Sequence, residues 1–120
     1  MLSEEDQYIK FRRKVELELT KVYRVRVILK TVVKYYGISR KLVVSDSTLA
    51  PLVYIRHMII YICCSIYGID QPKVAKFLRY KTRGGFGRIL DKMADEMRTN
   101  SRVNRELEEI RAILNKCLKQ

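Results

Sequence analysis

Cysteine and long apolar runs are both scarce in this sequence. It has 120 residues and three cysteines, and an odd count without regular spacing does not build a disulfide framework. The longest apolar stretch, MIIYICCSIYGI from Met58, is far shorter than the roughly 20 residues of a membrane span. The opening MLSEEDQYIK lacks the apolar segment of a signal peptide. We therefore expect a reduced, cytoplasmic protein with no place in a membrane.

Patterns that carry catalysis or bind metals are missing as well. The single histidine, His57, has no Ser/Asp set around it in the sequence, and GGFG is not followed by the Lys-Ser/Thr of a nucleotide-binding loop. Cys63 and Cys64 are neighbours, and on a helix they point about 100° apart, which does not suit one tetrahedral metal site. Free cysteines are usually buried, and we expect these two in the core. We predict no enzymatic activity, no catalytic residue, no metal and no cofactor.

Acidic residues are absent from two long stretches. The chain has 25 Lys and Arg against 13 Asp and Glu, a net charge of +12, yet no acid lies between Thr20 and Ser45 or within 71–90. Such a charge attracts polyanions over a Debye length of about 10 Å. Solvated helix faces are the plain alternative, because most runs of charge are only that. Two acid-free blocks in one small chain favour a nucleic-acid partner.

Apolar residues recur at helical spacing over most of the chain and predict an all-α fold. We expect a first long helix with Tyr8, Phe11, Val15, Leu19 and Val22 on one face, and a second from Val25 to Tyr36 that Gly37 ends. The polar SDSTLAP is a loop. The most apolar helix is expected from about Leu52 to Tyr67. The β-branched residues of 25–33 and 52–62 do not alternate, so we expect no strands there.

The second half predicts three further helices. Asp70 can cap a short helix that has Pro72 in its first turn, a second face begins at Phe86, and Ser101 opens the last helix. The expected fold is therefore one compact helical bundle of about five to six helices. A short helix, a tight turn and a longer helix over 72–97 is the plan of a helix-turn-helix.

The stretch QPKVAKFLRYKTRGGFGRIL, residues 71–90, contains the predicted DNA-binding residues. In a helix-turn-helix the second helix enters the major groove by its N-terminal end, so useful side chains gather in the turn. Glycines there allow backbone N–H groups to approach a phosphate, although they could serve only to form the turn. The predicted site residues of this stretch are Pro72, Lys73, Lys76, Arg79, Lys81, Thr82, Arg83, Gly84, Gly85 and Arg88.

The sequence also resembles a known family. KTVVKYYGI at 30–38, RHMIIYI at 56–62, Pro72 followed by KVAKFL, and ILDKM at 89–93 are similar to the C-terminal DNA-binding domain of the bacterial replication initiator DnaA. The resemblance implies an all-helical domain with a helix-turn-helix of the Trp-repressor type that binds duplex DNA. It divides the chain into an N-terminal helix, 1–22, and a domain, 23–120. It also implies that Arg56 and His57 contact DNA, although a lone histidine at a helix start is more often a structural hydrogen-bonding residue.

The resemblance is incomplete at the positions that read bases. The family's signature there is roughly Gly-Gly-Lys/Arg-Asp-His-Ser/Thr-Thr-Val, where this chain has RYKTRGGF, and Lys81 alone keeps its type. Two functions follow. The first is a stand-alone, nucleoid-associated binder of double-stranded DNA with a site preference of its own. The alternative is an adaptor or inhibitor that binds replication proteins and has lost base readout.

Overall fold

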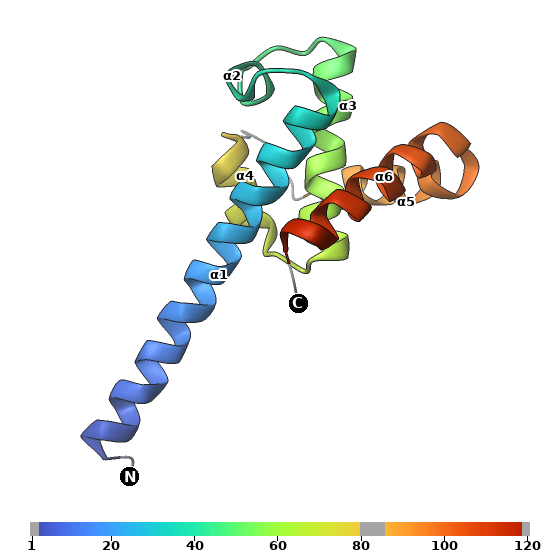
Figure 1. Cartoon of the computed structure of the whole chain (residues 1–120). Coiled ribbons are helices and arrows are strands. Elements are labelled where there is room, and N and C mark those ends of the chain that lie inside the picture. Colours follow the sequence, from blue (N-terminus) through green and yellow to red (C-terminus); the bar gives the residue numbers. More distant parts are fainter. Residues whose placement is uncertain (1–2, 80–85, 119–120) are drawn as a thin grey trace.

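The computed structural model describes residues 3–79 and 86–118, which form a helical body with one long projecting helix (Figure 1). The described chain has no strand, which confirms the all-α prediction. Its principal extents are 54 × 33 × 27 Å because the first helix runs well beyond the body. The elements are α1 (Glu4–Tyr36), α2 (Arg40–Val43), α3 (Ala50–Tyr61), a π-helical turn (Ile62–Ile66), α4 (Gln71–Leu78), α5 (Gly87–Thr99) and α6 (Ser101–Cys117).

Helix α1 is a single helix of 33 residues, so the expectation of two helices over this stretch is wrong. No glycine or proline interrupts residues 4–36, and the boundary predicted after residue 22 falls inside the helix. The Ser3 hydroxyl caps it by accepting from Asp6 N at 3.1 Å. It ends at Gly37, which has the left-handed φ of 66°, while Ile38 N donates to Val33 O at 3.0 Å.

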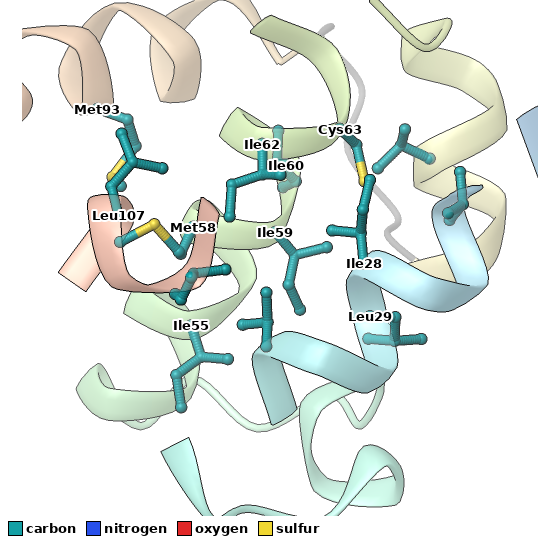
Figure 2. Packing of buried hydrophobic residues seen from close by; sticks show 14 of the residues in the cluster. Ile28, Leu29, Ile55, Met58, Ile59, Ile60, Ile62, Cys63, Met93 and Leu107 are labelled. Atoms are coloured by element: carbon teal, nitrogen blue, oxygen red, sulfur yellow. The ribbon is translucent and has the colours of Figure 1, made fainter. Parts of the chain in front are cut away.

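Helix α3 lies at the centre of the fold because it is apolar around most of its circumference. Its buried side chains pack against α1 on one side and against α5 on another (Figure 2). The helix continues into the π-helical turn, where Ile62 and Cys63 are fully buried. The predicted helix of residues 52–67 is thus an α-helix followed by one wider turn. The labelled core residues in Figure 2 are Ile28, Leu29, Ile55, Met58, Ile59, Ile60, Ile62, Cys63, Met93 and Leu107.

Helix α6 is held to α1 and α3 by a polar contact at the edge of the core. The Tyr36 hydroxyl donates to Glu106 Oε1 at 2.7 Å, and the Tyr54 hydroxyl donates to the same oxygen at 3.2 Å. Tyr35 donates to Glu109. Burial and these carboxylates raise the pKa of Tyr35 to about 12 and that of Tyr36 further, so both phenols stay protonated. One end of α1 is thereby fixed against the body.

No helix in the described ranges is long and apolar enough to cross a membrane.

Candidate nucleic-acid interface

Helix α4 presents basic side chains on one side and buries apolar ones on the other. Val74 and Leu78 are buried, while Lys76 and Arg79, three positions apart, are both exposed. Pro72 lies in the first turn and is exposed, as the sequence predicted for this short helix. Asp70 does not cap the helix with its side chain, contrary to expectation. Its carboxylate lies 3.5 Å from Lys21 Nζ instead.

Arg79 ends α4 in an uncommon backbone conformation. Its φ of 52° and ψ of 38° lie in the left-handed region. Among the described residues, Arg79 is the one non-glycine residue with a positive φ. Its N–H donates to Lys76 O at 3.3 Å, which closes the last turn. Helix α4 therefore ends at an exposed, left-handed arginine.

The start of α5 is tied back to the start of α4. Phe86 is buried at 1% exposure, and its N–H donates to Gln71 Oε1 at 3.0 Å. Arg88 follows in the first turn of α5 and is exposed. The starts of α4 and α5 are thus held together, while Arg79 ends α4 and Arg88 lies in the first turn of α5.

Arg56 lies inside the protein and not on this surface. Its side chain is 6% exposed, and its Nε donates to Val43 O at 2.5 Å. Its two terminal nitrogens donate to Ser47 O at 2.6 Å and to Ser45 O at 2.8 Å. These bonds hold the loop between α2 and α3 against α3. The placement does not support the predicted phosphate contact, because every nitrogen of the guanidinium already serves the fold.

Lys73 is occupied by an ion pair within the chain. Its ammonium group contacts the carboxylate of Glu18 on α1 and keeps only 18% of its side-chain surface exposed. The lysine lowers the pKa of Glu18, since it hydrogen-bonds the charged carboxylate. Together with the Lys21 and Asp70 pair, this contact anchors α4 to α1 and leaves Lys73 a smaller part in any DNA contact.

His57 is half-buried in a hollow between α3, α5 and the start of α6. Lys92 and Arg102 line the same hollow, as do Tyr54 and Glu96. Burial, and then the charges of Lys92 and Arg56, lower the pKa of His57. The imidazole is therefore neutral at pH 7 and can hydrogen-bond a phosphate without adding charge.

The remaining predicted residues, Lys81, Thr82, Arg83, Gly84 and Gly85, lie outside the described ranges. In the described ranges no group of three or more His, Cys, Asp or Glu side chains could hold a metal ion. Cys63 is buried, as expected, while Cys64 is only partly buried and has its pKa raised to about 11 by burial.

Three residues near this surface were not predicted from the sequence. Arg26 of α1 places its guanidinium 6.0 Å from the ring centre of Phe77 and so adds an exposed cation beside α4. The sequence signal that could have identified Arg26 is its position in the acid-free stretch between Thr20 and Ser45. No sequence pattern pointed to Gln71, which accepts a hydrogen bond from Phe86 N, or to Lys92, which lines the hollow of His57. Both roles depend on how the helices pack.

The chain matches no protein-family model, no curated protein and no solved structure.

Proposed function

We propose that this protein binds double-stranded DNA through α4, residues 80–85 and the start of α5, as a relative of the initiator's origin-binding domain. The observation that carries the proposal is the exposure of three cations, Lys76, Arg79 and Arg88, on a stretch without acids, residues 71–90. Among the described residues none of these three side chains takes part in an ion pair, unlike that of Lys73.

The arrangement suits phosphate binding better than base readout in the described ranges. Lysine and arginine on an exposed helix face neutralise phosphates and fix the orientation of a protein on the duplex without reading sequence. Arg88 lies in the first turn of α5, the part of a second helix that approaches the major groove. Within residues 80–85 we assign base readout to Arg83 and a phosphate contact to Lys81.

Fluorescence anisotropy on a random and an origin-like duplex at one salt concentration tests this function. We expect Lys76→Ala with Arg79→Ala to weaken binding to both duplexes, by about tenfold per lost phosphate contact, or roughly 1.4 kcal/mol each. Lys10→Ala with Lys116→Ala is the matched control, because both residues are exposed and lie on α1 and α6. Equal weakening by both pairs contradicts a defined site and leaves a diffuse positive field.

The same titration distinguishes DNA binding from the alternative function. An adaptor or inhibitor that binds replication proteins should not bind either duplex at moderate salt, even with its basic face intact. The single variants Lys81→Ala and Arg83→Ala, measured on the same two duplexes, test whether the protein reads sequence. We expect a uniform loss from Lys81→Ala and a loss that depends on the duplex sequence from Arg83→Ala, since arginine can contact a guanine edge with two hydrogen bonds.

A further inference from the structure

The N-terminal half of α1 carries large apolar side chains into solvent. Every residue from Ser3 to Thr20 is exposed, and Tyr8, Phe11 and Leu19 keep 64%, 64% and 62% of their surface. In Figure 1 this half, in blue, projects from the body without a neighbouring helix. The buried residues of the helix all lie in its other half: Val25, Ile28, Leu29 and Val32.

Four of the exposed apolar residues and the partly buried Val22 form one stripe along the helix, whereas the exposed Ile9, Leu17 and Tyr23 lie outside it. Its members, which we call the α1 stripe, are Tyr8, Phe11, Val15, Leu19 and Val22. At about 100° per residue they all lie within about 40° of the direction of Val15. A helix segment of this length is only marginally stable in water without packing, and a contiguous apolar surface usually marks an interface. Something is therefore expected to cover the stripe.

The spacing of the α1 stripe is the same in both directions from Val15. Steps of three, four, four and three residues separate its members, so a second α1 running antiparallel can face it with Val15 against the partner's Val15. In that register Phe11 lies level with the partner's Leu19, and Tyr8 lies level with the partner's Val22. Such a pair of helices overlaps over about 35 Å, from residue 4 to residue 26 of each chain.

The charges beside the stripe fit the same antiparallel register. Arg12 and Glu16, already paired at 3.2 Å within one helix, lie on one flank. Antiparallel pairing brings Arg12 near the partner's Glu16, which makes a cluster of two positive and two negative charges. Lys14 on the other flank lies near the partner's Glu18, a carboxylate that Lys73 and Lys21 already contact within each chain. A parallel pair would instead bring together the two acidic first turns, each with Glu4, Glu5 and Asp6.

We propose that this protein forms a homodimer in which the α1 stripes of two copies pack antiparallel about Val15. The two copies use the same surface, as a closed two-fold dimer requires. The bodies lie at opposite ends of the paired helices. The proposal does not depend on DNA binding, because it uses no residue of α4 or α5.

Sedimentation equilibrium over a hundredfold range of protein concentration measures the association. We expect a mass that rises to twice the 14.2 kDa of the chain. Val15→Asp should hold the protein at the mass of one chain, because it places two carboxylates at the two-fold axis. The control is Arg13→Asp, at an exposed position on the far side of the helix, which should leave the dimer intact. Circular dichroism should show the same helix content and a cooperative melt for both variants, since neither residue is in the core.

A charge exchange tests the register with less change to the helix. Glu16→Lys makes the flanking cluster wholly positive and should weaken the dimer by at least tenfold. Arg12→Glu in the same chain restores both the pair within the helix and the complementarity between copies, so the double variant should regain the dimer. A double variant that remains as weak as the single one contradicts the proposed register.

Cross-linking tests the orientation in a chain in which the exposed Cys117 is replaced by serine. On mild oxidation, a mixture of Phe11→Cys chains and Leu19→Cys chains should form a mixed disulfide, while Phe11→Cys alone should not form one. Efficient linkage of Phe11→Cys with itself overturns the antiparallel arrangement. A wild-type protein that stays at the mass of one chain at every concentration overturns the dimer and assigns the stripe to a different protein.

Discussion

Arg56 and Arg79 show that burial separates two arginines that look alike in the sequence. Both were predicted DNA-binding residues. Arg56 uses its guanidinium to hold three backbone carbonyls, one at the end of α2 and two in the loop between α2 and α3. Arg79 leaves its side chain exposed and accepts an unfavourable backbone conformation. The first should matter for stability and the second for binding.

Replacing Arg56 tests its structural role. We expect Arg56→Met to lower the free energy of unfolding by about 2 to 4 kcal/mol, because the carbonyls of Val43, Ser45 and Ser47 lose their donors. Urea unfolding followed by circular dichroism measures the change. Lys76→Met is the control at an exposed position and should change stability by less than about 0.5 kcal/mol. Unchanged stability together with weaker DNA binding would mean that Arg56 contacts DNA and does not stabilise the fold.

Replacing Arg79 should separate stability from binding. Arg79→Gly relieves a left-handed conformation that costs a side-chain residue about 1 kcal/mol, so we expect stability to rise by about 0.5 to 1 kcal/mol while DNA binding weakens. Lys76→Gly, inside the helix, should instead lose about 1 kcal/mol and weaken binding similarly. Thermal melting and anisotropy measure the two effects. A stability loss in Arg79→Gly would show that its side chain supports the fold.

At the scale of elements, α3 is joined to α5 through the hollow that contains His57. The half-buried imidazole faces Lys92, and its lowered pKa means that the folded protein favours the neutral form. The stability contributed by this preference is present above the usual pKa of about 6.5 and is lost as the pH falls through and below that value.

His57→Gln should remove this dependence on pH. We expect the free energy of unfolding of the wild-type protein to fall more steeply than that of the variant as the pH is lowered from about 7 to 5. Chemical denaturation at a series of pH values measures the difference, and the carboxylates common to both proteins cancel in it. Parallel curves for the two proteins would mean that His57 keeps its ordinary pKa.

At the scale of the whole molecule, the net charge overstates the number of basic side chains that can contact DNA. The site residues predicted from the sequence include seven Lys and Arg, but Arg56 is buried and Lys73 is paired with Glu18. Lys76, Arg79 and Arg88 remain in the described ranges, with Lys81 and Arg83 beyond them.

Salt dependence measures how many of these cations meet phosphates. With about three to five phosphates neutralised, log K for a duplex should fall with log salt at a slope of about −3 to −4.5. Anisotropy titrations between low and moderate salt give the slope. A slope near zero contradicts DNA as the ligand, whereas a much steeper one means that cations outside α4 and α5 take part.

The sequence by itself determined the all-α class and most helix ends, because these depend on local features. Helical periodicity, Ser3 before three acids, and Gly37 and Gly68 after apolar runs act within a few residues. It also identified the acid-free stretch on which Lys76, Arg79 and Arg88 lie exposed. The prediction of two helices in place of α1 was wrong, because a helix can bury different faces along its length without a break.

Only the tertiary structure decided which charged residues remain free and which apolar ones are covered. Arg56 reaches carbonyls up to 13 residues away in the chain, and Lys73 pairs with a carboxylate 55 residues away. The same apolar spacing runs along all of α1, yet Val25 and Leu29 are buried while Phe11 and Leu19 are exposed. Periodicity shows that a helix has an apolar face, but burial depends on what packs against it, and that partner comes from distant parts of the chain or from another molecule.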